Sequence, residues 1–157
     1  MSLWVIYTMK KGLYLIAFFT FSLLQIPSFA ETNNLAPEEI TGARTINTDT
    51  ANFLINKGHS LIDVRGAVDF NNGHIPGASH LPVKNEVFSP GNLRKIVAQD
   101  QAVIFYCNGI HCMGSSIATK RAIEWGWTNV FYYRDGFEGW KDAGLDVKVN
   151  SDSDNTY

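Results

Sequence analysis

The stretch AVIFYCNGIHCMGSSIATKRAIEWG, residues 102–126, decides the fold because it holds a strand, a loop and a helix in succession. Residues 102–106 are five apolar residues in a row, which is typical of a strand buried on both faces. From about Ser115, apolar residues recur at helical spacing as far as Gly126, which suits the end of a helix. A buried strand that leads into a helix is the repeating unit of a parallel sheet.

The same alternation continues on both sides of this stretch. Further strands are predicted at residues 61–64, 78–81 and 129–133. Further helices are predicted from the capping residues 48–50 to Gly58, around residues 93–98, and at residues 137–143. Because strands that alternate with helices imply right-handed crossovers, we predict an α/β fold with a mainly parallel sheet and helices on both faces.

Both cysteines of the chain, Cys107 and Cys112, lie five residues apart in the loop. Such a pair can form a disulfide, bind a metal, or include a nucleophile that its neighbour modulates. In parallel α/β sheets the functional crevice lies at the carboxyl ends of the strands, where Cys107 is expected. The start of the following helix favours a thiolate, and Gly109 and Gly114 let backbone N–H groups point at the sulfur. The pattern predicts an anion cradle with a nucleophile at its base.

Two residues of the loop have alternative roles. Cys112 either forms a disulfide with Cys107 or acts as a resolving thiol that attacks an adduct on Cys107. His111 either supplies positive charge and proton transfer or points to solvent. A metal site made of Cys107, His111 and Cys112 has compressed spacing and lacks a fourth ligand, so no metal is predicted.

The first thirty residues have the layout of a secretory signal peptide. A basic pair at residues 10–11 precedes a mostly apolar run at residues 13–26, and cleavage is predicted after Ala30. The alternative is an uncleaved N-terminal anchor. Export to the periplasm or the outside places the two cysteines in an oxidising compartment. The remaining boundaries are predicted as a flexible leader at residues 31–44, one domain at residues 45–149 and a disordered tail at residues 150–157.

Composition narrows the range of partners. The net charge is −2 and no run of Lys or Arg occurs, which argues against nucleic acid, and no membrane contact is expected after signal cleavage. Asp63 and Arg65 are expected to orient the fold as paired charges, and His74 to form a structural hydrogen bond. Aromatic residues near the end of the domain are expected mainly in the core, with an exposed remainder that docks a partner: Trp125, Trp127, Phe131, Tyr132 and Tyr133.

Three motifs in order resemble the rhodanese family of single-domain sulfurtransferases, and together they cover most of residues 45–147. The first is LIDVRGAVDFNNGHIPGASHLP, residues 61–82, in which Asp69 stands where the family usually has glutamate. The second is a strand that ends in Tyr-Cys and leads into a glycine-bearing loop and a helix. The third is RDGFEGWKDAGLDV, residues 134–147, in which Asp135 replaces the first glycine of the family's closing motif.

The resemblance implies a rhodanese-like fold with a five-stranded sheet and a sulfurtransferase without a cofactor. Cys107 would accept the outer sulfur of a donor such as thiosulfate or polysulfide, hold it as a persulfide, and pass it to a thiol or to cyanide. The implied partners are these small sulfur compounds and a redox or sulfur-accepting protein. The residues expected to bind the substrate are Asn108, Gly109, Ile110, Met113, Gly114 and, at the mouth of the site, Arg65.

The loop departs from the family pattern in its charge. A typical loop carries basic residues, whereas no Arg or Lys lies between Cys107 and Ser116, which weakens the attraction for a dianionic donor. Arg65 and Arg134 are candidates for the mouth, although the arginine of the family's Asp-Val-Arg motif is more often structural. The loop is most similar to that of an exported subgroup with a second cysteine five residues after the catalytic one.

Two other functions fit the same residues. One is a thiol–disulfide redox module that cycles Cys107 and Cys112 between dithiol and disulfide. The other is a non-catalytic, partner-binding domain in which the two cysteines form a permanent disulfide. A phosphatase or arsenate reductase on this scaffold needs an arginine near the end of the loop, where Met113 and Gly114 stand, so these classes are disfavoured.

Overall fold

The computed structural model describes residues 34–150 of the chain. The predicted signal peptide at residues 1–30 and all but Asn150 of the predicted tail lie outside the described residues. Within residues 34–150, no helix is both long enough and apolar enough to cross a bilayer.

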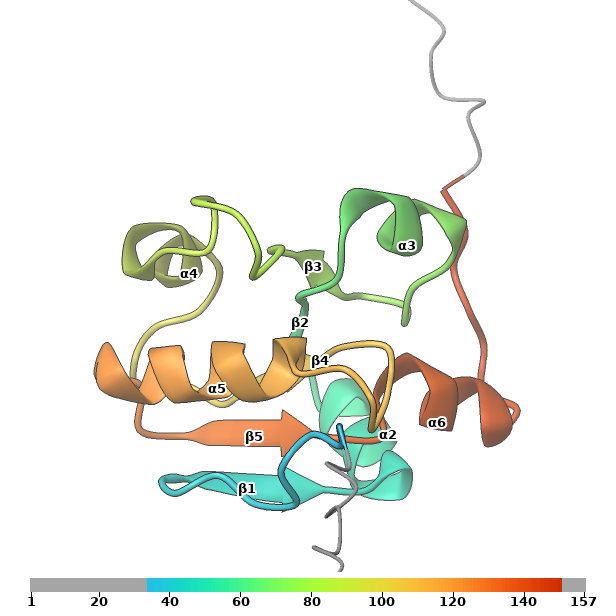
Figure 1. Ribbon diagram of the computed structural model, residues 1–157, viewed down its shortest axis with the longest axis horizontal. Coiled ribbons are helices and arrows are strands. Elements are labelled where there is room, and N and C mark those ends of the chain that lie inside the picture. Colours follow the sequence, from blue (N-terminus) through green and yellow to red (C-terminus); the bar gives the residue numbers. More distant parts are fainter. Residues whose placement is uncertain (1–33, 151–157) are drawn as a thin grey trace, which may run out of the picture. The chain divides into compact units, whose positions relative to one another are not determined.

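Five strands form one sheet in which every neighbouring pair is parallel (Figure 1). The order across the sheet is β1-β5-β4-β2-β3, so β4 lies in the middle. The strands are β1 (Ala43–Ile46), β2 (Ser60–Asp63), β3 (Ser79–His80), β4 (Val103–Tyr106) and β5 (Val130–Tyr133). This confirms the predicted α/β fold with a parallel five-stranded sheet.

Two apolar clusters, one on each face of the sheet, join the strands to different helices. Successive residues of β4 point to opposite faces, so Phe105 belongs to one cluster and Tyr106 to the other. Helices α4 (Pro90–Ile96) and α5 (Gly114–Glu124) contribute to the first cluster, whereas α2 (Thr48–Asn56) and α6 (Gly136–Asp142) contribute to the second. The predicted cover of helices on both faces is therefore confirmed.

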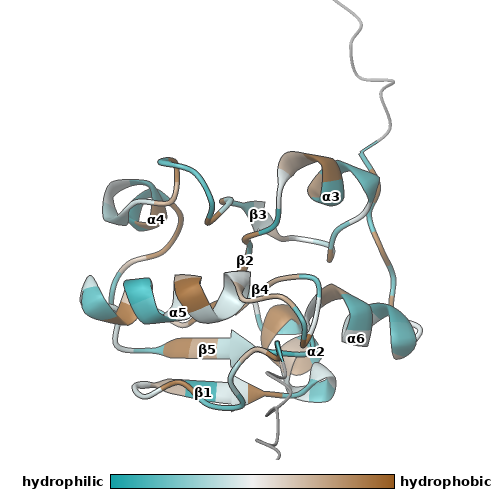
Figure 2. Ribbon diagram, in the orientation of Figure 1, coloured by the Kyte–Doolittle hydropathy of each residue, from teal (hydrophilic) through white to brown (hydrophobic). Residues whose placement is uncertain are grey.

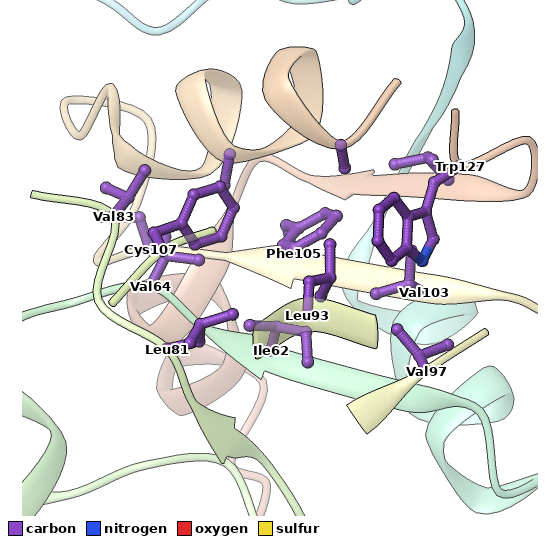
Figure 3. Close-up of a cluster of buried hydrophobic side chains, with 14 residues drawn as sticks. Ile62, Val64, Leu81, Val83, Leu93, Val97, Val103, Phe105, Cys107 and Trp127 are labelled. Atoms are coloured by element: carbon purple, nitrogen blue, oxygen red, sulfur yellow. The ribbon is translucent and has the colours of Figure 1, made fainter. Parts of the chain in front are cut away.

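The first cluster ends at the cysteine loop. Figure 3 shows Cys107 beside Val64 and Val83 at one end of the cluster, and Trp127 beside Val103 at the other. Helix α5, which covers this cluster, carries both hydrophilic and hydrophobic stretches along its ribbon (Figure 2), as expected for a helix with one buried face. The apolar core thus extends up to Cys107.

Two elements differ from the prediction because they lack an apolar pattern. Strand β1 is an edge strand, and most of its residues are at least partly exposed. Helix α3 (Ala67–Asn72) has no buried residue at all, so its sequence shows no helical period of apolar residues. Helix α2 already includes Thr48, one of the predicted capping residues, because the capping side chain is Asn47, which accepts a hydrogen bond from the N–H of Thr50 at 3.0 Å.

Residues 34–44 pack against the domain, which differs from the flexible leader expected for residues 31–44. Ala36 and Ile40 are only 2% and 4% exposed. The hydroxyl of Tyr132 donates to the carbonyl of Pro37 at 3.1 Å. Strand β1 then begins at Ala43. The composition of this segment is mostly polar, but its two buried apolar side chains pack against the domain and hold the segment in place.

Candidate active site

Cys107 follows directly after β4 at the carboxyl end of the central strand. Its side chain is 4% exposed and is joined to Cys112 by a disulfide, with the two Cα atoms 6.1 Å apart. The N–H of Cys112 donates to the carbonyl of Gly109 at 2.9 Å, which closes the turn between the cysteines. The disulfide, one of the alternatives left open by the sequence, is the state found here.

Gly114 brings both sulfur atoms against the start of α5. A Cβ atom at this position would lie 2.9 Å from Sγ of Cys107 and 3.4 Å from Sγ of Cys112. Any side chain there would force the sulfurs away from the first turn of the helix. When the disulfide is reduced, the free N–H groups and partial positive charge of the helix end favour a thiolate on Cys107.

The start of α6 holds the other side of the loop. The N–H of Phe137 donates to the carbonyl of Cys107 at 2.9 Å, and the N–H of Glu138 donates to the carbonyl of Asn108 at 2.7 Å. Gly136, which precedes them, has φ of 58°, and a Cβ there would collide with the carbonyl oxygen of Cys107. The closing motif at residues 134–147 therefore serves to fasten the cysteine loop.

Arg65 is committed to a buried ion pair. Its Nη2 lies 2.6 Å from Oδ2 of Asp63, its Nε donates to Oδ1 at 3.0 Å, and both side chains are at most 2% exposed. The hydroxyl of Tyr106 donates to the same carboxylate at 2.5 Å and accepts from the N–H of Ile75 at 3.1 Å. This network agrees with the expectation that the two charges orient the fold.

The pKa values reflect this arrangement. Burial alone lowers the pKa of Arg65, but the hydrogen bonds and charge of Asp63 outweigh burial, so the pKa lies above its ordinary value. Burial and then the charge of Asp63 raise the pKa of the Tyr106 hydroxyl well above its ordinary value. Arg65 therefore stays charged and Tyr106 stays protonated, and the network keeps one hydrogen-bonding pattern.

Arg65 touches the loop without opening toward a substrate. Its Nη1 donates to Oδ1 of Asn108 at 3.4 Å, and its guanidinium lies over the Phe137 ring, 4.2 Å from the centroid. Its Nη2 also donates to the carbonyl of Gly73 at 2.7 Å. With its donors used in this way and 4% of its surface exposed, Arg65 supports Asn108 rather than lining the mouth.

The two histidines of the 61–82 motif form a stack. The rings of His74 and His80 lie on either side of Phe70, with centroids 3.9 Å and 4.4 Å from the phenylalanine ring. His74 shares a hydrogen bond of 2.9 Å between its Nδ1 and the carbonyl of Phe70. Nε2 of His80 pairs with the carbonyl of Arg65, also at 2.9 Å. This agrees with the structural role expected of His74.

The other predicted site residues lie together in the loop. Asn108, Ile110 and Cys112 are half-buried, Gly109 and Gly114 are buried, and His111 and Met113 are exposed. His111 thus has the exposed position of one of its two predicted alternatives. Among residues 34–150, no group of three or more His, Cys, Asp or Glu side chains is placed to hold a metal ion.

Two contacts to the loop were missed by sequence reasoning. The N–H of Ala36 donates to the carbonyl of Ile110 at 2.7 Å, while the carbonyl of Ala36 accepts from Nε and Nη2 of Arg134 at 3.0 Å and 2.9 Å. The N-terminal segment thus links Arg134 to the loop. The carboxylate of Glu138 lies against Gly109, where a Cβ would collide with its Oε2. Neither contact has a local signal, because each joins distant parts of the chain.

A sequence model of the rhodanese-like domain family matches residues 47–143. The chain is 32% identical over 90 residues to the thiosulfate sulfurtransferase GlpE of Shewanella oneidensis, an alignment that covers 55% of this chain and 80% of that protein. It is also 32% identical over 88 residues to an HTH-type transcriptional regulator of Mycobacterium tuberculosis, with coverage of 56% of this chain and 37% of the regulator. The chain therefore spans less than half of the regulator's length.

Solved structures show the same fold at lower identity. The BH2092 protein from Bacillus halodurans has a TM-score of 0.61 and 23% identity, with 69% of this chain and 78% of that chain covered. The polysulfide-sulfur transferase homodimer from Wolinella succinogenes has a TM-score of 0.57 and 18% identity, with 74% and 85% covered. Identities this low establish similarity of fold alone.

Proposed function

This chain belongs to the rhodanese-like domain family, and on that premise we propose that it is a sulfurtransferase whose Cys107 carries the transferred sulfur. One observation carries the proposal: Sγ of Cys107 lies at the carboxyl end of the central strand, against the first residue of α5. The thiosulfate sulfurtransferases among the relatives support it from the sequence side, at identities of 32% and 34% for two of them.

The reaction begins when a dithiol reduces the Cys107–Cys112 disulfide. The Cys107 thiolate attacks the outer sulfur of a donor such as thiosulfate or polysulfide, so a new S–S bond forms while the donor's S–S bond breaks. Sulfite or a shorter sulfide leaves with the electron pair. An acceptor thiolate or cyanide then attacks the terminal sulfur of the persulfide and regenerates the Cys107 thiolate. In this scheme the loop from Asn108 to Gly114 binds the sulfur.

The disulfide favours a second candidate function, a thiol–disulfide redox module. The Cys112 thiolate can attack the Cys107 sulfur of the persulfide, which forms the disulfide and releases hydrosulfide with balanced electrons. In this reading Cys112 is a resolving thiol and the donor's sulfur leaves as sulfide. The third function, a partner-binding domain with a permanent disulfide, requires neither step.

We also propose that the protein works outside the cytoplasm, as a periplasmic or secreted domain. The signal-peptide pattern of residues 1–30 is the main support, and the disulfide agrees with an oxidising compartment. A reductant or sulfur acceptor would then be another protein of that compartment.

The test is the intact mass of the reduced protein after incubation with thiosulfate or polysulfide under nitrogen, followed by peptide mapping. Gain of one sulfur on Cys107, absent in Cys107→Ser, supports the sulfurtransferase. Loss of two hydrogens with no retained sulfur supports the redox module, and Cys112→Ser should then trap the persulfide. An unchanged mass with both donors would leave the partner-binding domain.

A further inference from the structure

We propose that the site selects sulfur donors with at most one negative charge, and that Glu138 is the residue that disfavours dianions such as thiosulfate. The inference rests on the sulfurtransferase function proposed above and narrows its donor class. Three observations carry it: the position of Glu138, the engagement of the nearby arginines, and the lack of basic residues in the loop.

Glu138 brings a carboxylate onto the cysteine loop. Its backbone N–H is held by the carbonyl of Asn108 at 2.7 Å, so the residue sits directly beside the loop. Its Oε2 and Cδ occupy the space that a side chain at Gly109 would need. Gly109 is buried and Glu138 is exposed, and the carboxylate of Glu138 lies against Gly109. Because Gly109 is only two residues after Cys107, a donor bound at Cys107 lies within the field of this negative charge.

The two arginines near the loop direct donors to other groups. Arg65 is paired with Asp63. Arg134 directs Nε and Nη2 to the carbonyl of Ala36. The loop itself has no Arg or Lys between Cys107 and Ser116.

Two further charges lie on α6 or next to it. Lys141 has its ammonium 5.2 Å from the centroid of the Phe137 ring, one turn further along α6. Asp135, which directly precedes α6, adds a second negative charge at the start of this helix. The charges around this loop therefore attract a dianion less strongly than the basic residues of a typical loop of this family do.

The expected discrimination follows from the charge of the donor. Glu138 is exposed, so its field acts through water and is screened by salt. In water, a second donor charge held about 4 to 6 Å from a unit charge changes a rate constant by about three- to fivefold. The effect should therefore appear at low ionic strength and diminish as salt is added.

Thiosulfate and methanethiosulfonate form a suitable pair of probes. Both present the same outer sulfur, but thiosulfate carries two negative charges and methanethiosulfonate carries one. Attack by the Cys107 thiolate forms the same persulfide from either donor and releases sulfite or methanesulfinate. The difference between their rate constants therefore reports on donor charge with little change in reacting chemistry.

The experiment measures the second-order rate of persulfide formation by mass spectrometry in a Cys112→Ser background, which leaves Cys107 as the only thiol. Glu138→Gln should raise the rate with thiosulfate about three- to fivefold relative to methanethiosulfonate. Glu124→Gln is the matched control, because it removes the same charge from the far end of α5. An unchanged ratio in Glu138→Gln, or an equal change in Glu124→Gln, would overturn the inference.

A second readout separates this inference from the proposed function. Iodoacetate and iodoacetamide alkylate Cys107 at rates that differ through the charge of the reagent, whether or not a persulfide forms. Glu138→Gln should raise the iodoacetate-to-iodoacetamide ratio, and Glu124→Gln should not. A shifted alkylation ratio without any persulfide would refute the proposed sulfurtransferase function, but it would still support the effect of the Glu138 charge on Cys107. An unshifted ratio alongside a normal persulfide would refute the role of Glu138 alone.

Discussion

The buried ion pair between Asp63 and Arg65 should contribute strongly to the free energy of unfolding of the domain. In Arg65→Met the side chain keeps a similar length but loses the contacts at 2.6 Å and 3.0 Å to the Asp63 carboxylate. The carboxylate would keep the backbone N–H of residue 65 at 2.9 Å and the Tyr106 hydroxyl at 2.5 Å. Both partners are almost wholly buried, so removing one leaves an uncompensated charge and should lower the free energy of unfolding by about 3–5 kcal/mol.

Urea denaturation at neutral pH, with the disulfide intact, measures this loss. The double variant Asp63→Asn/Arg65→Met removes both charges, so it should lose less stability than the sum of the two single variants. A loss below about 1 kcal/mol in Arg65→Met would mean that the pair behaves like an exposed salt bridge. Additive losses in the double variant would equally refute the reasoning, because they would show that the two charges do not depend on each other.

Three further predictions concern the loop and the aromatic core. Reducing the Cys107–Cys112 disulfide should lower the free energy of unfolding by about 2 kcal/mol through loop-closure entropy, measured by urea denaturation of the oxidised protein and the Cys107→Ser/Cys112→Ser variant. Gly136→Ala should lower the free energy of unfolding by about 1–3 kcal/mol in the same assay, because the positive φ is strained for alanine and the new Cβ would meet the Cys107 carbonyl. An unchanged free energy of unfolding would show that α6 can shift freely. Burial raises the pKa of Tyr133 to about 12. In the unfolded chain the tyrosine ionises near pH 10, so the contribution of this pKa shift to the free energy of unfolding is fully present below about pH 10. The contribution is lost as the pH rises through the pKa of the folded state. Tyr133→Phe should flatten the decline of stability above about pH 10 relative to the native protein, and an unchanged decline would contradict it.

The parts of the fold with a strong apolar pattern could be predicted from the sequence. Strand β4 and helix α5 were expected within two residues of their observed bounds, because a fully buried strand and an amphipathic helix each leave a periodic signature. The placement of Cys107 at the end of β4 followed from the same pattern. Edge strand β1 and the exposed helix α3 leave no such signature, since neither has a continuous apolar face.

The fine structure of the site depended on contacts between distant residues. The sequence allowed Arg65 to face the mouth or to pair with Asp63, and only the folded chain distinguishes these. Glu138 lies 29 positions after Gly109, and no local pattern indicates that its carboxylate covers that glycine. The same is true of Ala36, whose small side chain gives no hint that its backbone bridges Arg134 and the loop.

The hydrogen bond between Ala36 and Ile110 has a practical consequence for handling the protein. Asn34, the first residue that the structure describes, is two positions before Ala36, so it lies within about 7 Å of the residue that bonds to the cysteine loop. A truncation that removes Ala36 would therefore take away the donor to the carbonyl of Ile110 and the acceptor of Arg134 together.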